Sequence, residues 1–216
     1  MTNRAFTLAE VLITLGVIGV VAAITIPTLI QNYQKQVTVN RLKETYSILE
    51  QAVKMSEIDN GDVTEWQYPK NTEQSHIDWI NKYLAPYMKN VTVKSAGEDY
   101  ARADIILANG TIIDIWNGNN ENNTQVHAYV YFTKKDKAEN GKNLFMYYIG
   151  YGTNEYCLFK DKKGVRPYDF TNGFQNDDIR KILRDAPTFG CNEESRGLCA
   201  ALIMYDGWQI KDDYKW

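Results

Sequence analysis

The residues with reactive or metal-binding side chains are few, and their spacing limits the chemistry they can do. The three cysteines of this 216-residue chain, Cys157, Cys191 and Cys199, all lie in its last third. No two of them have the gap of two to four residues found in structural zinc sites, and His76 and His127 stand alone in the sequence. We therefore expect neither a metal nor a cofactor.

Catalytic patterns are equally sparse. The sequence has no glycine-rich phosphate loop and no G-x-S-x-G nucleophile motif, and Asp114 in its alternating segment is expected to face solvent. Two short lysine runs, 134–137 and 160–163, are interrupted by acids and lack an aromatic stacking platform, so nucleic acid is not an expected partner. Most tyrosines and tryptophans are assigned to the core and to subunit contacts. We expect no enzymatic activity.

One acidic residue stands out by its position. Glu10 immediately precedes Val11–Ile30, a run of twenty residues without a charge. As a helix with a rise of about 1.5 Å per residue, this run spans roughly 30 Å, the thickness of the hydrocarbon core of a bilayer. An acid at the edge of such a segment is costly unless it has a partner, which makes Glu10 a candidate functional residue.

The rest of the composition is that of a globular protein. Hydrophobic residues make up 44% and charged residues 24%, with a net charge of −3, which excludes disordered and multi-span membrane proteins and gives no overall basic character. The apolar run fits a secretory signal peptide with small residues at Val21-Ala22-Ala23, or a plain single-pass anchor. Against the signal peptide, Arg4 is the only fixed charge before the run and Glu10 lies at its edge.

The helical pattern also continues beyond the apolar run. Four further residues recur at the spacing of one helix face: Leu42, Tyr46, Leu49 and Val53. The sequence therefore predicts one long helix from about Phe6 to Ile58, ended by Asp59-Asn60-Gly61. Pro27 removes a backbone donor within this helix, which predicts a kink or a locally loosened turn.

Beyond Gly61 the composition predicts a β-rich head. A short helix is expected over Ser75–Met88, with Ser75 as its N-cap. Asn109-Gly110 is predicted as a two-residue hairpin turn, and Asp206-Gly207 as the turn of a last hairpin. The predicted strands are Ala103–Leu107, Thr111–Trp116, Val126–Phe132, Leu144–Gly150, Glu155–Phe159, Ala201–Tyr205 and Trp208–Ile210.

The expected fold is α+β: a long N-terminal helix, transmembrane and then amphipathic, packed on an antiparallel β-sheet. The chain ends in an aromatic tail with Trp208, Tyr214 and Trp216. Because three large aromatic side chains would be costly in solvent, this tail is expected to dock onto the head.

The N-terminus carries a family resemblance. The residues Arg4-Ala5-Phe6-Thr7-Leu8-Ala9-Glu10-Val11-Leu12-Ile13, with the apolar run and Pro27, closely resemble the start of type IV prepilins and of the related pseudopilins of type II secretion. The resemblance implies that a prepilin peptidase cuts between Ala5 and Phe6 and methylates the new amine of Phe6. Ala5 departs from the glycine that is usual before the cut. The implied parts are a leader (1–5), a transmembrane and filament-core helix (6–30), an amphipathic helix (31–60) and a pilin-like head (61–216).

The position of Glu10 fits this processing. Cleavage after Ala5 would leave a cationic amine about one helical turn from the Glu10 carboxylate. In a bundle of such helices, Glu10 of one subunit can neutralise the Phe6 amine of its neighbour. A neighbour in the wrong register would leave both charges unpaired, so this pair is expected to set axial register more than to add stability.

The resemblance extends to the head. Pilin heads often carry a disulfide that closes a C-terminal surface loop, which implies a Cys191–Cys199 bond and leaves the state of Cys157 open. The segment Val130–Phe145 resembles a pilin region near which some pseudopilins hold calcium. Because only Asp136 and Glu139 are acidic in this lysine-rich segment, a calcium site is not expected there.

The resemblance thus implies a structural subunit of a type IV pilus-like filament. Its expected partners are copies of itself or other pilins, the prepilin peptidase, a filament assembly platform and, before assembly, the cytoplasmic membrane. The head would lie outside the cytoplasm, and the assembled form would be a cell-surface pilus or a periplasmic pseudopilus. The alternatives are a type II secretion pseudopilin, a minor tip pilin that binds a surface ligand or DNA, and an uncleaved single-pass anchored binding protein.

Overall fold

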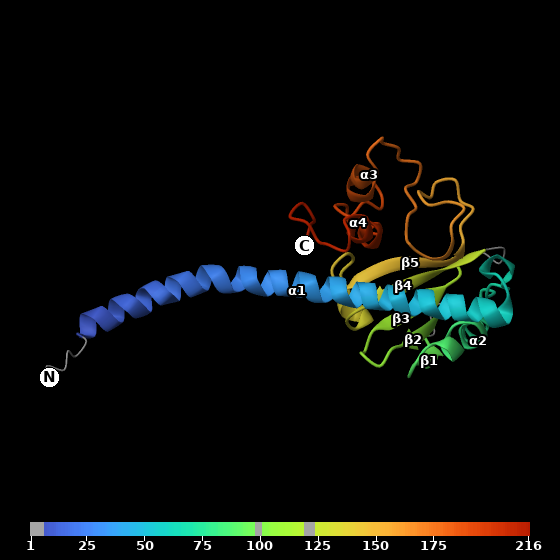
Figure 1. Cartoon of the computed structure of the whole chain (residues 1–216), viewed down its shortest axis with the longest axis horizontal. Coiled ribbons are helices and arrows are strands. Elements are labelled where there is room, and N and C mark those ends of the chain that lie inside the picture. The colour runs from blue at the N-terminus through green and yellow to red at the C-terminus, as the bar shows by residue number, and fades with distance from the viewer. Residues whose placement is uncertain (1–6, 98–100, 119–123) are drawn as a thin grey trace. The chain divides into compact units, whose positions relative to one another are not determined.

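The computed structural model describes residues 7–97, 101–118 and 124–216 (Figure 1). The chain divides into two compact units, Met1–Val37 and Thr38–Trp216. The long helix α1 (Leu8–Asn60) contributes to both units and continues through Pro27 without interruption. Gly61 follows α1 with a φ of +79°, a left-handed conformation that ends a helix at little cost in a residue without a Cβ. The predicted long helix is confirmed to within two residues at each described end.

A β-sheet forms the centre of the second unit. Within the described residues it has six strands in the order β1-β2-β3-β4-β5-β6, and every neighbouring pair is antiparallel. The predicted α+β fold with an antiparallel sheet is therefore confirmed. The strands are β1 (Thr92–Ser95), β2 (Ala103–Ile106), β3 (Ile112–Trp116), β4 (Gln125–Tyr131), β5 (Leu144–Tyr151) and β6 (Lys163–Pro167).

The main core lies between α1 and one face of this sheet. The second half of α1 crosses the sheet (Figure 1). The predicted stripe is buried there at Leu42, Leu49 and Val53. The ring of Tyr46 packs against Tyr147 of β5 with 5.9 Å between the ring centroids. The sheet residues that share this face are Ile105, Ile113, Ile115, Val126, Ala128, Val130, Phe145, Tyr147, Ile149 and Val165.

Arg41 fixes the helix on the sheet by polar contacts. Its guanidinium group donates to the Phe132 carbonyl oxygen and to the Thr111 hydroxyl, each at 3.0 Å, and lies over the Phe132 ring. These bonds join α1 to the ends of β3 and β4 across a long stretch of sequence. Hydrophobic burial and a specific polar anchor therefore hold this half of α1 in place.

The short helix after α1 begins earlier than predicted. Helix α2 (Glu73–Tyr83) has Thr72 as its N-cap, and the Thr72 hydroxyl accepts a hydrogen bond from the Ser75 backbone N–H. The assignment of Ser75 as the cap is therefore wrong, because two hydroxyl residues three positions apart offered the same signal. The Ser75 hydroxyl instead accepts from the Lys70 N–H.

The turn between β2 and β3 is longer than predicted by one residue. Leu107 donates its N–H to Thr111, so Ala108, Asn109 and Gly110 form the loop. Gly110 has a φ of +80° and takes the left-handed position of a three-residue hairpin loop. The hairpin itself is confirmed, and its two-residue turn is corrected.

One predicted strand next to β5 is wrong. Residues 155–159 form turns with a single bridge between Cys157 and Phe170, and the strand beside β5 is β6. The sequence of β6, KGVRP, contains glycine and proline and gave no strand signal. A proline is tolerated there because β6 is an edge strand.

The predicted C-terminal hairpin is also wrong, because its first strand is helical. Helices α3 (Ile179–Asp185) and α4 (Cys199–Tyr205) pack together near β5 (Figure 1). Trp208 donates its N–H to Ile203 at 2.8 Å and Gly207 donates to Met204 at 3.1 Å, which is the Schellman pattern of a helix end. Asp206-Gly207 is thus a helix terminus, and the short apolar run before it, CAALIMY, is helical.

The aromatic tail docks onto the head, as predicted. Tyr214 is 5% exposed, and its hydroxyl donates to the carbonyl oxygen of Gly141 in the β4–β5 loop. Asp213 forms ion pairs with Arg180 at 2.7 Å and Arg184 at 2.8 Å. One aromatic and one charged contact therefore tie the last residues to two separate segments.

Candidate functional site

The start of α1 is fixed by a reciprocal pair of side chains. The Thr7 backbone N–H and hydroxyl donate to Oε2 of Glu10 at 2.8 and 2.9 Å, and the Thr7 hydroxyl accepts from the Glu10 N–H at 3.2 Å. This is a capping box, which satisfies donors at the helix start that have no intrahelical acceptor. The Thr-x-x-Glu spacing of residues 7–10 indicates such a box, although the cap was not among the predictions from the sequence. Ala5 and Phe6 lie outside the described residues.

The two hydrogen bonds from Thr7 to the Glu10 carboxylate end on the same oxygen, Oε2. Within the part of the chain that the structure describes, Oε1 accepts no hydrogen bond. A carboxylate has room for about four hydrogen bonds, so capping leaves capacity for a further donor. Glu10 can therefore cap its own helix and pair with a cation from outside at the same time.

The surface of α1 after Glu10 is apolar on all sides. No residue of the most apolar 18-residue stretch of α1 is buried inside the protein. Among the described helices, α1 is the one that is long and apolar enough to cross a membrane. A helix that is hydrophobic all round is stable only inside a core or a membrane. The large apolar residues of α1 between Leu8 and Ile30 are between 42% and 78% exposed: Leu8, Val11, Leu12, Ile13, Leu15, Val17, Ile18, Val20, Val21, Ile24, Ile26, Leu29 and Ile30.

Two of the three threonine hydroxyls within this apolar stretch are satisfied by the helix itself. The Thr14 hydroxyl donates to the Glu10 and Val11 carbonyl oxygens at 2.9 Å, and the Thr25 hydroxyl donates to Val21 at 2.9 Å. These hydroxyls do not need water, which suits an environment without water. Pro27, by contrast, leaves the α-helical acceptor four residues before it without its usual donor.

The predicted disulfide is present and lies in a packed cluster. Cys191 and Cys199 are bonded, and both are buried. A Cβ added to Gly141 would lie 2.5 Å from the Cys199 sulfur, so the β4–β5 loop packs directly against the bond and needs glycine there. Arg196 donates to the Cys191 carbonyl oxygen at 3.1 Å. Cys157 is a buried free cysteine.

A buried ionic cluster on the other face of the sheet was missed by the sequence reading. Asp104 and Asp114 lie directly opposite each other on β2 and β3, and Lys135 bonds to both at 2.6 and 2.8 Å. Arg102 lies 3.6 Å from Asp114. Asp114 is buried, so its predicted exposure to solvent is wrong, and Lys135 is not simply solvated. The alternating pattern was present, but that face of the sheet is covered rather than wet.

The two histidines make contacts that stabilise the fold. His76 accepts a hydrogen bond at Nε2 from the Asn117 N–H at 3.1 Å, and its Nδ1 lies 2.7 Å from the Thr72 carbonyl oxygen. His127 packs among aromatic rings, including those of Trp116 and Tyr148. Burial lowers the pKa of His127 to about 4, with a further contribution from nearby arginines. Both imidazoles are therefore neutral at pH 7, and burial also lowers the pKa of His76.

The described residues hold no group of three or more His, Cys, Asp or Glu side chains that could bind a metal ion. In the segment Val130–Phe145, Glu139 pairs with Lys142 at 3.3 Å, and Asp136 is exposed in the turn Lys135–Lys137. The features that distinguish this chain are therefore an unburied apolar helix with a capped acid at its start and a separately folded head.

Comparison with protein families gave one match. A family model described as "Family of unknown function (DUF6613)" matches residues 28–216. The matched region begins within α1 and covers the whole second unit. The comparisons with curated proteins and with solved structures found no match.

Proposed function

We propose that this chain, which belongs to the DUF6613 family of unknown function, is a structural subunit of a type IV pilus-like filament. In this proposal a prepilin peptidase cuts between Ala5 and Phe6 and methylates Phe6, and the subunit polymerises through its N-terminal helix. The cytoplasmic membrane holds the helix before assembly, and the head remains outside the cytoplasm. A filament assembly platform and copies of this chain or other pilins are the partners.

The observation that carries the proposal is the unburied apolar half of α1. Thirteen large apolar side chains between Leu8 and Ile30 are exposed, and burying them would contribute on the order of 20 kcal/mol. A bilayer can bury them before assembly, and neighbouring helices can bury them in a filament core. The same segment can thus serve first as a membrane anchor and then as an assembly surface. The head has a core of its own and does not need this segment to fold.

The geometry of Glu10 supports a role in register. Its Oε2 caps the helix, while its Oε1 has no donor within the described residues. The proposed partner is the Phe6 amine of a neighbouring subunit, a cation that would otherwise be unpaired in an apolar bundle. Glu10 is the one acidic residue in the sequence between positions 7 and 30, and it lies in the first turn of α1. The amine of a neighbouring subunit can therefore pair with its carboxylate in one axial position.

Two substitutions separate the capping role of Glu10 from its charge. Glu10→Gln keeps an oxygen that can accept from Thr7 but removes the negative charge, whereas Glu10→Ala removes both. We expect both variants to insert into the membrane and both to lose most filament assembly, measured as subunit in the sheared surface fraction. Thr14→Val, which removes a hydroxyl already satisfied within the helix, is the matched control and should assemble normally. Normal assembly of Glu10→Gln would rule out charge pairing as the device that sets register.

A further inference from the structure

The two lysine runs of the sequence lie at opposite ends of the β-sheet. Residues 134–137 and Lys142 belong to the connection between β4 and β5, whereas Lys160 and Lys162 belong to the connection between β5 and β6. Successive connections of an antiparallel sheet turn at alternate ends, so these two connections lie at opposite ends of the strands. Both belong to the second unit of the chain.

The first run lies at the end where α1 enters the head. The Thr38 hydroxyl donates to the Lys142 carbonyl oxygen at 3.4 Å, and Arg41 donates to the Phe132 carbonyl oxygen at 3.0 Å. The Phe132 N–H donates to the Asn143 carbonyl oxygen at 2.8 Å, which closes the base of the β4–β5 connection. The first residues of α1 in the second unit are therefore bonded to this connection.

The second run lies near the other end of α1. Lys163 forms an ion pair with Asp62, which follows the last residue of α1 by two positions. Between Thr38 and Asn60 the helix rises by about 33 Å. The second run is therefore far from the point at which α1 enters the head, and it provides a natural comparison for the first run.

Chain connectivity holds this entry point close to the membrane. In the proposed function the membrane-spanning segment ends at Ile30, and Thr38 follows after eight residues. Eight residues span about 12 Å as a helix and about 28 Å when fully extended. The short connection therefore keeps the lipid headgroups within reach of this end of the head, whichever way the head turns.

Basic residues outnumber acidic residues at this entry point. We call residues 38–44 and 132–143 together the entry face. Its basic residues are Arg41, Lys43, Lys134, Lys135, Lys137 and Lys142, and its acidic residues are Glu44, Asp136 and Glu139. Lys135 already pairs with two buried aspartates, so five cations remain against three anions. Lys43, Lys134 and Lys137 are exposed.

An anionic lipid surface is the partner that suits this face. Lipid headgroups attract cations through their summed charge and need no fitted pocket, and each lysine close to such a surface changes the docking equilibrium on the order of fivefold. The connection to the membrane-spanning segment also raises the effective concentration of headgroups at the entry face. A freely diffusing anion has no such advantage.

We propose that the entry face docks on the anionic headgroups of the membrane that holds α1. Lys134 and Lys137 contact lipid phosphate groups, and Lys43 and Lys142 lie beside them on the same surface. The docking is noncovalent. It holds the head against the membrane before assembly, and extraction of the subunit into a filament breaks it.

This inference rests on one part of the proposed function, the anchoring of α1 in the membrane. It uses neither cleavage after Ala5 nor the pairing of Glu10, so it can fail while filament assembly holds. Conversely, a loss of assembly in the Glu10 variants should leave the docking unchanged.

The test compares the full chain in two kinds of vesicle, phosphatidylcholine alone and an equal mixture of phosphatidylcholine and phosphatidylglycerol. An impermeant amine-acetylating reagent labels exposed lysines, and mass spectrometry of peptides gives the labelling rate of each. We expect Lys134 and Lys137 to react at least about threefold more slowly in the mixed vesicles, because docking covers them. Lys160 and Lys162 should react at the same rate in both kinds of vesicle.

A charge-reversed variant separates docking from mere closeness to a charged surface. Lys134→Glu combined with Lys137→Glu changes two exposed side chains and should abolish docking. Lys43 and Lys142, which are protected in the unchanged chain, should then react equally fast in both kinds of vesicle. Continued protection of these two lysines in the mixed vesicles would overturn the proposal.

The matched control reverses the same number of charges at the far end of the head. Lys160→Glu combined with Lys162→Glu also changes exposed side chains, and Lys134 and Lys137 should keep their protection in this variant. Loss of that protection would overturn the proposal, because it would show a dependence on overall charge. Slow labelling of Lys134 and Lys137 in both kinds of vesicle would also overturn it, because another partner, such as a second copy of the chain, would then cover the face.

Flotation with the vesicles distinguishes the two ways in which the test can fail. A chain that does not float would overturn the anchoring of α1 and the docking together. A chain that floats but whose Lys134 and Lys137 react equally fast in both kinds of vesicle would overturn the docking alone.

Discussion

Replacement of Lys135 by methionine is expected to lower the free energy of unfolding of the head by about 3 kcal/mol at pH 7. The Lys135 ammonium group lies 2.6 Å from Asp104 and 2.8 Å from Asp114. The side chains of these two aspartates are only 5% and 3% exposed, and they face each other across β2 and β3. Without Lys135, two like charges remain buried side by side.

The expected loss of about 3 kcal/mol follows from the known cost of leaving a buried charge without its partner. Removal of one partner of a buried ion pair costs about 3–5 kcal/mol, and Lys135 is 29% exposed, which favours the lower end of this range. In the variant Arg102 still lies 3.6 Å from Asp114, so the loss of a cationic partner affects Asp104 more than Asp114. The variant can neutralise Asp104 instead, which costs about 1.4 kcal/mol per pH unit between an ordinary pKa near 4 and pH 7, or at most about 4 kcal/mol.

The same reasoning fixes the sign of the pH dependence. Burial already raises the pKa of Asp104 despite Lys135, and the substitution should raise it further. Above about pH 4 the folded variant would then keep a proton that the unfolded chain releases. Its stability should therefore increase as the pH falls, and the deficit relative to the unchanged chain should shrink between pH 7 and pH 5.

The assay is urea unfolding of a truncated chain that begins at residue 31, followed by tryptophan fluorescence at pH 7 and pH 5. Residues 38–216 form a compact unit with their own core, so this chain should fold without the apolar segment. Lys137→Met, in the same turn but exposed, is the control and should change stability by less than about 0.5 kcal/mol. Adding Asp104→Asn to Lys135→Met should restore at least half of the loss. A loss that is equally large at both pH values, or that Asp104→Asn does not relieve, would refute the reasoning.

Two further predictions concern the head. Deletion of residues 213–216 removes the buried Tyr214 and the two ion pairs of Asp213, and should cost about 3 kcal/mol and lower the Tm of the truncated chain by roughly 6–12 °C. Lys215→Ala should leave the Tm unchanged, and an unchanged Tm of the deletion would show that the tail contributes nothing. Burial lowers the pKa of His127 from 6.5 to about 4, so the unfolded chain binds more protons in this window and stability should fall by up to about 3 kcal/mol on acidification from pH 6.5 to pH 4. His127→Gln should reduce that fall, measured by urea unfolding at pH 6.5 and pH 4.5, and an identical fall in both chains would contradict the burial argument.

Patterns that repeat over many residues of the sequence predicted the fold best. The length of α1 and its buried stripe followed from apolar periodicity, because many residues repeat the same signal. The strands β2 to β5 followed from alternation and from the Asn109-Gly110 turn. The predictions that failed concern short segments. Residues 201–205 and 155–159 are five-residue segments, too short to show a helix or strand period, and their contacts with distant parts of the chain decide between helix, strand and turn.

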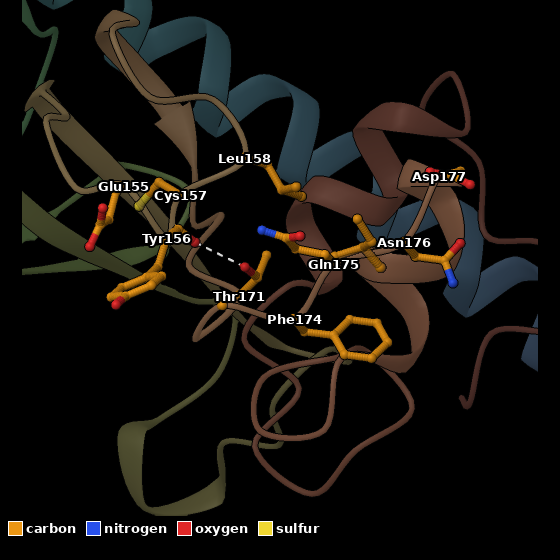
Figure 2. A pocket seen from close by; sticks show the side chains of 11 residues that line it. Glu155, Tyr156, Cys157, Leu158, Thr171, Phe174, Gln175, Asn176 and Asp177 are labelled. Carbon is orange, nitrogen blue, oxygen red and sulfur yellow. Dashed lines mark hydrogen bonds between the residues drawn. The ribbon is translucent and has the colours of Figure 1, made fainter.

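The candidate functional residues divide in a similar way. Glu10 was identified as an acid at the edge of an apolar run, but its capping bond to Thr7 was not predicted, although the Thr-x-x-Glu spacing indicates it. The buried pairing of Asp104 and Asp114 could not be predicted, because it depends on Lys135 reaching them from a loop more than twenty residues away in sequence. The open pocket lined by residues of segments 155–158 and 171–177 likewise joins two loops that the sequence assigned to no site (Figure 2).

N-terminal mass spectrometry of the chain recovered from sheared surface material tests the central proposal most directly. The proposal predicts a mature chain that begins at N-methylated Phe6 and is present in the sheared fraction. A chain that still carries residues 1–5 and stays with the membrane fraction would contradict it and would favour a single-pass anchored protein instead.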